Sequence, residues 1–451
     1  MEFVHKMEKA KQKDQWGSRL GFILATAGSA VGLGNLQRFP YLTAECGGSA
    51  FVFIYILCVL VLGIPLMLLE LSIGRHTQKN PVDGIKQLSP KGPWKYVGVL
   101  GILTSFFILT YYLIASGWTL GYVFQMAGNQ LIPYDEFVAM PHYVIPCTAA
   151  MLLTVVLIVK KGLQNGIEFW NKILMPSLVL LLLILLLRSV TLPNSWEGIT
   201  YYLYPDFSEV NGKVFLYALS QAFFSLSIGE AVLFTYGSYC SKKENIVKSA
   251  YCIAFFDTAV AILSGLILFP AIFSFGVFPQ QGVGLIFHIM PGIFMQMPFG
   301  NILGAFFFLM LSFAALTTCI ALLEIPVSYL VNARGWSRNA AAWTLAAIAF
   351  IISIPSALSK GANVFLSTIK IECFNVIGFQ EIMDFVWGAL AMIIGSFFLT
   401  IFASRIWGIK NAVKELRSGC SHFSWQGTLW GIIIKYITPL AIAIVFFGQF
   451  L

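Results

Sequence analysis

Charged residues are scarce in this sequence of 451 residues. Only 11% of them are Asp, Glu, Lys or Arg, whereas soluble proteins average about 25%. Apolar residues make up 58% of the chain, and the mean hydropathy is +0.81. This composition excludes an ordinary soluble protein and predicts a polytopic membrane protein.

The sequence also lacks the residue patterns of metal sites, disulfide frameworks and common enzymes. Its five histidines are isolated, and it has no CxxC pair and no His/Cys cluster. We find no nucleophile–base pair and no nucleotide-binding loop. These absences argue against an enzyme. The eight cysteines lie mostly in apolar runs, where cysteine is a small apolar filler, at positions 46, 58, 147, 240, 252, 319, 373 and 420.

Long apolar runs recur along the whole chain. Each is long enough to cross about 30 Å of hydrocarbon as a helix. The first fifteen residues, MEFVHKMEKAKQKDQ, have no apolar core, so we expect no cleavable signal there. We predict eleven transmembrane helices at 17–42, 48–73, 95–125, 141–159, 167–190, 214–240, 247–276, 302–331, 340–356, 382–404 and 429–450.

Basic residues indicate the orientation of these helices. If the N-terminus is cytoplasmic, every Lys and Arg of the 28 falls in a cytoplasmic segment except Arg38, Arg188, Lys213, Lys360 and Lys370. Cytoplasmic loops carry such an excess, which also explains the net charge of +8 without nucleic acid. We therefore predict a multi-pass protein of the plasma membrane with a cytoplasmic tail at 1–14 and an extracellular C-terminus.

Two of the predicted helices are interrupted near their centres. The first contains AGSAVGLGNLQRFP (27–40), and the sixth contains LSQAFFSLSIGEAVLFTYGSY (219–239). Glycine, proline and buried polar groups all weaken a helix in lipid. Glycines alone can serve close helix packing, but polar residues inside both breaks favour a binding site at the bilayer midplane.

The positions of the breaks suggest a repeat. Breaks in helices one and six divide the chain into halves of five helices, at 15–190 and 191–405. Because five is odd, the second half is inverted. We place an extracellular hairpin at 277–300 in the second half, and a cytoplasmic loop and an eleventh helix at 406–451. The predicted fold is all-α, an inverted 5+5 repeat plus one helix.

Freed backbone groups explain what such breaks bind. Unwound carbonyls coordinate a hard cation such as Na⁺, and exposed N–H groups at a half-helix start hold a carboxylate. Asp257 is an intramembrane carboxylate that requires a partner. Thr317 and Thr318 add two hydroxyls, although threonine also bonds back to its own helix. We expect Glu70 to satisfy freed N–H groups of the sixth helix.

Long ordered motifs resemble the neurotransmitter:sodium symporter family, particularly its bacterial amino-acid transporters with eleven helices. They include WGSRLGFILATAGSAVGLGN, GIPLMLLELSIGR, YYLIASGWTLGY, SQAFFSLSIG, SGLILFPAIFSFG and FAALTTCIALLE, and the match runs from Trp16 to about Phe447. The resemblance implies a sodium-coupled symporter that imports an amino acid by alternating access. Inverted repeats are a known feature of that family, so the repeat and the resemblance are not independent.

The resemblance also implies ligand residues for two Na⁺ ions and one substrate. The first sodium site comprises Ala30, Asn35, Ser225 and Asp257, with the substrate carboxylate. The second comprises Gly28, Val31, Ala314, Thr317 and Thr318. The substrate site comprises Ala30, Gly34, Ile108, Tyr112, Phe224, Ser225, Ser227, Glu230, Thr318 and Leu322.

Gating residues follow from the same resemblance. Arg38 and Asp384 resemble the outer gate pair, with Phe224 as its lid. Trp16, Ser238 and Tyr239 resemble parts of the inner gate. Gly166 and Pro176 match the spacing seen where the fifth helix unwinds towards the second sodium site.

The sequence departs from the family pattern in places that affect function. Asp257 stands where many members have Asn, and Ala261 lacks a carboxylate that some bacterial members carry; a fixed charge at Asp257 implies independence of chloride. Asn332 replaces an inner-gate Asp, with only Lys13 opposite. This departure leaves a non-transporting amino-acid sensor on the same scaffold as the alternative function.

Glu230 occupies a pocket position that is usually apolar or aromatic in the family. A buried carboxylate requires a partner, and two interpretations remain open. Glu230 either pairs with a cationic or hydrogen-bonding substrate, or is protonated or turned towards Glu70 or Glu324.

Overall fold

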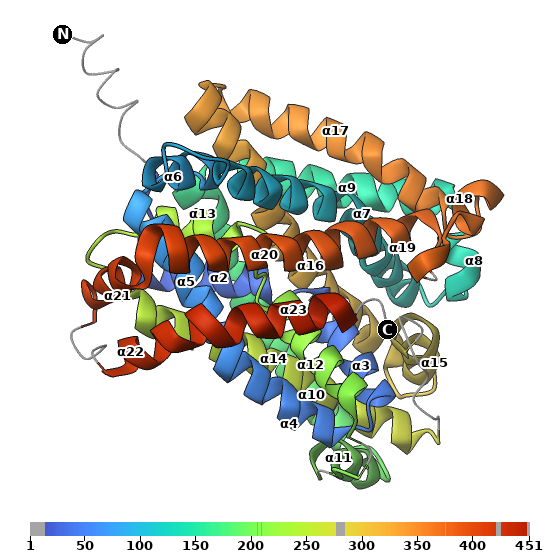
Figure 1. Cartoon of the computed structure of the whole chain (residues 1–451). Helices are drawn as coiled ribbons and strands as arrows, with labels where there is room; N and C mark the ends of the chain where they lie inside the picture. The colour runs from blue at the N-terminus through green and yellow to red at the C-terminus, as the bar shows by residue number, and fades with distance from the viewer. Residues whose placement is uncertain are drawn as a thin grey trace.

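The computed structural model describes residues 14–204, 206–208, 210–276, 285–374, 376–420 and 425–448. Most of these residues form helices, as the long apolar runs predict (Figure 1). Lys13, most of the predicted tail at 1–14 and residues 277–284 of the predicted hairpin lie outside the described residues.

Helices of α type alternate with short π-helical segments, which are labelled η together with one 3₁₀ turn, η5. The first half contains α2 (Arg19–Ala30), η1 (Gly34–Arg38), α3 (Phe39–Glu45), α4 (Ser49–Cys58), η2 (Val59–Gly63), α5 (Ile64–Thr77), α6 (Pro81–Leu88), α7 (Lys95–Ala127), α8 (Tyr134–Val138), α9 (Pro141–Val159), η3 (Leu163–Glu168) and α10 (Phe169–Val190).

The second half contains α11 (Ser195–Leu203), α12 (Gly212–Ser225), α13 (Val232–Ser238), α14 (Ile246–Ser274), η4 (Leu285–Ile289), α15 (Met290–Met295), α16 (Gly300–Arg334), α17 (Arg338–Leu358), α18 (Val364–Thr368), η5 (Glu372–Phe374), α19 (Phe379–Met383), η6 (Asp384–Ala391), α20 (Met392–Ile401), η7 (Phe402–Gly408), α21 (Ile409–Arg417), α22 (Trp425–Ile432), η8 (Ile433–Ile437) and α23 (Thr438–Gly448). The described strands, β1 (Lys370–Ile371) and β2 (Val376–Ile377), form an antiparallel pair that pairs Lys370 with Ile377.

Membrane-length helices occur where the sequence predicts them. Among the described residues, nine helices are long and apolar enough to cross a membrane, and the bent pair Arg19–Ala30 and Gly34–Glu45 makes a tenth. The predicted sixth span, 214–240, forms the two shorter helices α12 and α13 instead. The count of eleven therefore stays a prediction, while both breaks lie where the sequence places them.

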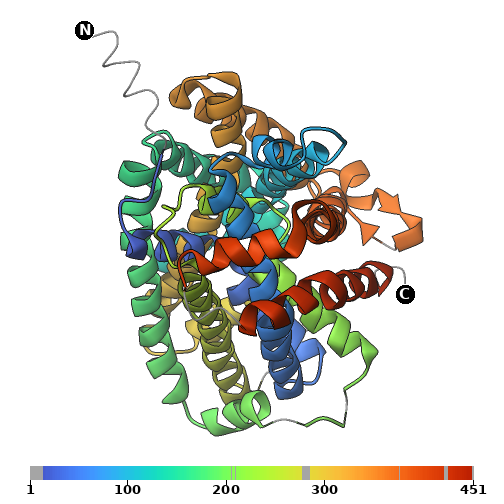
Figure 2. The ribbon, with the colours of Figure 1, turned by 60° about the vertical axis from the view of Figure 1, so that its left-hand side comes forward.

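Short helices gather at the two ends of the long ones. In Figure 1, α6 and α21 lie at one end of α7 and α20, and α8, α15 and α18 lie at the other. The C-terminal helices α20 and α23 pack against each other on one face in both views (Figure 2). In the helix Gln426–Gly448, only 33% of the apolar stretch is buried, whereas in Gly300–Arg334 the buried share is 83%. We therefore place α16 inside the bundle and the last helix at its lipid-facing surface.

Candidate functional site

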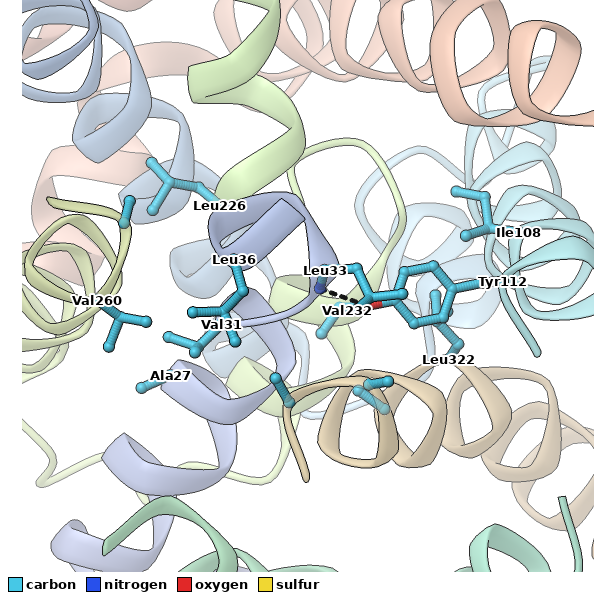
Figure 3. Packing of buried hydrophobic residues seen from close by; sticks show 14 of the residues in the cluster. Ala27, Val31, Leu33, Leu36, Ile108, Tyr112, Leu226, Val232, Val260 and Leu322 are labelled. Carbon is cyan, nitrogen blue, oxygen red and sulfur yellow. Dashed lines mark hydrogen bonds between the residues drawn. The ribbon is translucent and has the colours of Figure 1, made fainter. Parts of the chain in front are cut away.

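A residue of α7 stabilises the break in the first transmembrane helix. Helix α2 ends at Ala30, and the chain resumes as the π-helical segment η1 at Gly34, with a bend of 50°. The Leu33 N–H, freed by the break, donates to the Tyr112 hydroxyl at 2.8 Å (Figure 3). Such a freed group in lipid must find a partner, so Tyr112 stabilises the unwound backbone as well as lining the space beside it.

The break in the sixth helix uses strained backbone. Between α12 and α13 the chain turns through positive φ at Ser227 (52°), Gly229 (87°) and Ala231 (60°). For residues with a side chain this conformation costs of order 1 kcal/mol each and persists only where the surroundings impose it. Glu70 accepts a hydrogen bond from the Gly229 N–H at 2.8 Å. This contact confirms the role predicted for Glu70.

Asn35 joins the two breaks to α14. Its side-chain N–H₂ donates to Asp257 Oδ1 at 2.7 Å, to the Asp257 carbonyl at 3.0 Å and to Ser225 Oγ at 3.1 Å. Ser225 Oγ donates to Asp257 Oδ2 at 2.7 Å. All three side chains are buried, and Asn35 Oδ1 has no hydrogen-bond partner among the described residues. These are three of the four residues that the sequence assigned to the first sodium site, and the fourth, Ala30, is the last residue of α2.

Tyr55 belongs to this cluster, and the sequence reasoning did not single it out. Its hydroxyl lies 3.1 Å from Ser225 Oγ and 3.4 Å from Asp257 Oδ2. Gln221 is a second addition, because its amide donates to the Gly34 carbonyl at 2.8 Å. Both residues are 0% exposed. The only sign of these two residues in the sequence is that a hydroxyl and an amide lie within apolar runs.

The residues of the predicted second sodium site lie where α2 meets α16. Thr318 Oγ1 is 3.3 Å from the Ser29 carbonyl and 3.2 Å from the Ala314 carbonyl, and Thr317 Oγ1 is 2.9 Å from the Ala314 carbonyl. Both threonines thus bond back to their own helix, as threonines in helices commonly do. Thr318 also bridges to α2, at the carbonyl of Ser29, which lies between the predicted ligands Gly28 and Val31.

Glycines in the first break allow other helices to approach it closely. An added Cβ at Gly32 would lie 2.6 Å from both Tyr112 Oη and Thr318 Oγ1. An added Cβ at Gly34 would lie 2.8 Å from the Phe224 ring. These two positions therefore require glycine, because a side chain there would displace residues of the predicted substrate site.

Several other residues of the predicted substrate site lie beside the same break. Figure 3 shows Ile108, Tyr112 and Leu322 close together beside Leu33. Ser227 Oγ donates to the Ser29 carbonyl at 3.3 Å, across the two broken helices. Glu230 is only 4% exposed.

The predicted outer gate is arranged around a cavity of about 370 Å³. Arg38, Asp384 and Phe224 line this cavity. The Arg38 guanidinium lies 4.8 Å from the centre of the Phe224 ring and donates to Gln221 Oε1 at 3.3 Å. No ion pair joins Arg38 to Asp384 in the part of the chain that the structure describes. The structure therefore brings Arg38 and the Phe224 lid together, and leaves Asp384 exposed to the cavity.

The predicted inner gate packs one broken helix against the other. Trp16 Nε1 donates to the Tyr236 carbonyl at 3.0 Å, and its ring contacts the rings of Tyr236 and Tyr239. Ser238 and Tyr239 line a second cavity of about 620 Å³, together with Asn332. Gly166 lies in the π-helical segment η3, and Pro176 lies inside α10.

A buried ion pair beside the inner gate was missed by the sequence reasoning. Arg338 pairs with Glu324, which is 0% exposed, and with Asp14 at 3.4 Å. Tyr239 donates to the other Glu324 oxygen at 2.8 Å. Asn332 and the undescribed Lys13 are therefore not the sole basis for closing this side. No hydrogen bond joins Glu324 to Glu230 among the described residues.

Removing one member of this pair is expected to destabilise the protein. We expect Arg338→Gln to lower the unfolding free energy by about 3 kcal/mol, because Glu324 stays buried without its cation. The double variant Glu324→Gln/Arg338→Gln should recover most of that loss in thermal melts of purified protein. Arg334→Gln, at the exposed C-terminal end of α16 just before the turn that leads to Arg338, is the matched control. Equal losses for Arg334 and Arg338 would contradict this assignment.

Paired breaks at the centre of a helical bundle define the class of ion-coupled membrane transporters with a midplane site. The chain also matches the profile of the Sodium:neurotransmitter symporter family over residues 13–138 and 140–451, and it belongs to that family. It is therefore a multi-pass sodium-coupled transporter and not an enzyme, as the sequence predicts, and Na⁺ is its coupling ion.

Two curated relatives are bacterial transporters. The chain is 35% identical over 441 residues to the uncharacterized sodium-dependent transporter YhdH of Bacillus subtilis, covering 96% of each protein. It is 34% identical over 460 residues to an uncharacterized sodium-dependent transporter of Haemophilus influenzae, covering 97% of this chain and 98% of the relative.

A solved structure has the same fold. MhsT, crystallised in complex with L-phenylalanine, superposes with a TM-score of 0.88 at 39% identity, covering 97% of this chain and all of MhsT. This match confirms the predicted fold class.

Proposed function

We propose that the protein imports an amino acid together with two Na⁺ ions by alternating access. The observation that carries this proposal is the Asn35 cluster, in which one amide ties both broken helices to α14 and keeps a buried oxygen without a donor. Amide, carboxylate and hydroxyl oxygens that lie side by side are suitable ligands for a hard cation. The phenylalanine bound to MhsT supports an amino acid as the substrate.

Each ligand has a set of residues that would hold it. The first Na⁺ would be held by Asn35, Asp257, Ser225 and the Ala30 carbonyl. The second would be held by Thr317, Thr318 and the carbonyls of Gly28, Val31 and Ala314. The carboxylate of the substrate would contact Na⁺, the Gly34 backbone and Tyr112. The side chain of the substrate would lie among Ile108, Phe224, Ser227, Glu230, Thr318 and Leu322.

Coupling follows because each ligand supplies contacts for the other. Na⁺ neutralises Asp257 and draws Asn35 and Ser225 together, so the two breaks adopt one arrangement. The substrate carboxylate then adds a further oxygen to the first Na⁺, and its binding free energy depends on that ion. Phe224, which lies over Gly34 and under Arg38, would close the outer side once the site is filled.

We infer that transport does not require chloride. Asp257 places a fixed carboxylate in the first sodium site, 2.7 Å from both Asn35 and Ser225. In related animal transporters chloride supplies this negative charge, so a second anion here would be electrostatically unfavourable.

We further propose that the protein lies in the plasma membrane with its N-terminus in the cytoplasm and its C-terminus outside the cell. Residues 15–190 and 191–405 would form the two inverted halves. Helices α6 and α21 gather at one end of the bundle (Figure 1) and carry Lys86, Lys410, Lys414 and Arg417. Basic residues favour the cytoplasmic side.

Transport can be tested in proteoliposomes. We expect accumulation of a radiolabelled amino acid under an inward Na⁺ gradient, and its loss when choline replaces Na⁺. Replacing chloride by gluconate should leave the rate unchanged. Uptake that persists without Na⁺ would refute coupling, and Na⁺-dependent binding without flux would favour the alternative, a sensor.

A further inference from the structure

Asn171 is a buried polar residue on α10 to which neither the sequence nor the family resemblance assigns a role. It is 1% exposed and lies near the start of α10, which packs against α2. An amide at this depth is costly unless its polar atoms are satisfied. Its two ends therefore need separate explanation.

The nitrogen end of this amide is satisfied by its own helix. Asn171 Nδ2 donates to the Ile167 carbonyl at 2.8 Å. This bond also fixes the orientation of the amide, because a flipped side chain would place Oδ1 against that carbonyl. The oxygen end therefore points away from α10, and Asn171 Oδ1 has no donor among the described residues.

The free oxygen points at the junction of α2 and α16. A Cβ added to Gly28 would lie 2.4 Å from Asn171 Oδ1 and 3.3 Å from Thr317 Cβ. The oxygen therefore lies against the Gly28 backbone, on the side that also faces Thr317. Gly28 and Thr317 are two of the residues proposed to hold the second Na⁺.

Chemistry narrows what this oxygen can bind. It is a neutral acceptor without a donor, and it lies beside Gly28 on the side that faces Thr317. The hydroxyls of Thr317 and Thr318 already donate to the Ala314 and Ser29 carbonyls. A set made only of acceptor oxygens attracts a cation and repels another acceptor. Asn35 Oδ1 shows the same feature at the first site.

We propose that Asn171 Oδ1 is a further ligand of the second Na⁺, supplied by α10. This proposal rests on the proposed function, because it requires a sodium ion between α2 and α16. It would tie a third helix to that ion, so that Na⁺ occupancy sets the position of α10 against α2.

Sodium binding is best measured without transport. Thermal melts of the purified full-length chain, titrated with NaCl at constant ionic strength with choline chloride, report affinity because bound Na⁺ stabilises the folded state. We expect Asn171→Leu to raise the half-saturating Na⁺ concentration at least about tenfold, because loss of even an outer partner of a metal site costs about 10- to 100-fold in affinity. Asn171→Asp keeps an oxygen in place, so it should match or exceed the wild-type affinity. Ser177→Ala, on the exposed side of α10, is the control and should not change the titration.

A structural role for Asn171 predicts a different pattern. In that case Asn171→Asp, with a buried charge, would weaken Na⁺ binding as much as Asn171→Leu, or neither variant would move the titration; either result overturns the proposal. Repeating the Leu substitution in an Asp257→Ala background, with the first site impaired, should give the same shift, and its disappearance there would assign the effect to the first site instead. A wild-type protein that does not respond to Na⁺ refutes the proposed function itself, whereas a responsive wild type with an unshifted Asn171→Leu refutes only this inference. If Asn171→Leu does not fold, Asn171→Ala replaces it.

Discussion

Asp257→Ala is expected to abolish Na⁺-driven accumulation while leaving a folded protein. The carboxylate accepts hydrogen bonds from Asn35, Ser225 and Tyr55 within one buried cluster. Hydrogen bonds to a charged group contribute about 1.5–3 kcal/mol each. Losing the charge that faces the ion should thus weaken Na⁺ binding at least ~100-fold, since each 1.4 kcal/mol is a factor of ten. Uptake under a fixed Na⁺ gradient, and the Na⁺ concentration for half-maximal uptake, measure the effect.

A neutral isostere separates charge from shape. Asp257→Asn keeps the hydrogen-bonding outline but removes the fixed negative charge, so we expect residual uptake that rises when chloride is added. Asp135→Asn, whose carboxylate is 82% exposed on α8, should behave as the wild type. Full activity of Asp257→Ala at limiting Na⁺ would show that the first sodium site lies elsewhere.

The broken helices were predictable because glycine, proline and buried polar residues conflict with a helix in lipid whatever its surroundings. The sequence therefore placed both breaks, and it assigned Glu70 to the freed N–H groups of the sixth helix for the same reason. These predictions depend on local chemistry that a single run of sequence displays. The grouping of Asn35, Ser225 and Asp257 in one sodium site came instead from the family resemblance.

Other contacts depend on packing that no single run displays. A tyrosine in an apolar helix, such as Tyr55, normally packs against neighbours, and only the docking of α4 beside α12 brings its hydroxyl to Ser225. Asn171 bonds back to its own helix, as an isolated Asn would, so its free oxygen becomes evident only beside Gly28. Glu324 and Arg338 are joined by the turn between α16 and α17, which the predicted helix ends left undefined.

Glu230→Gln is expected to change which amino acids the protein accepts. The Glu230 carboxylate has no hydrogen bond or ion pair among the described residues, although the residue is 4% exposed. Glu324 accepts hydrogen bonds from Arg338 and Tyr239. Glu70 accepts the Gly229 N–H with Oε1, while its buried Oε2 has no hydrogen-bond partner among the described residues. The free Glu70 Oε2 keeps both interpretations of Glu230 open, and substrate competition separates them.

Cationic side chains are the expected partners. We expect lysine, arginine and ornithine to compete for uptake, and Glu230→Gln to weaken them about 10- to 100-fold, the scale of a charge-assisted hydrogen bond in a buried site. Leucine and tryptophan should be affected less, because they do not use the charge. Competition by unlabelled amino acids against one labelled substrate gives the ranking for each variant.

Two observations decide the matter. Glu136→Gln, at an exposed position of α8, is the matched control and should keep the wild-type ranking. If only neutral amino acids compete and Glu230→Gln preserves their order, the carboxylate does not contact the substrate side chain. Glu230 would then be held neutral by its apolar surroundings, because an unpaired charge at the bilayer midplane is too costly to keep. If the cationic ranking is found and collapses in Glu230→Gln, this one departure from the family pattern sets the substrate class.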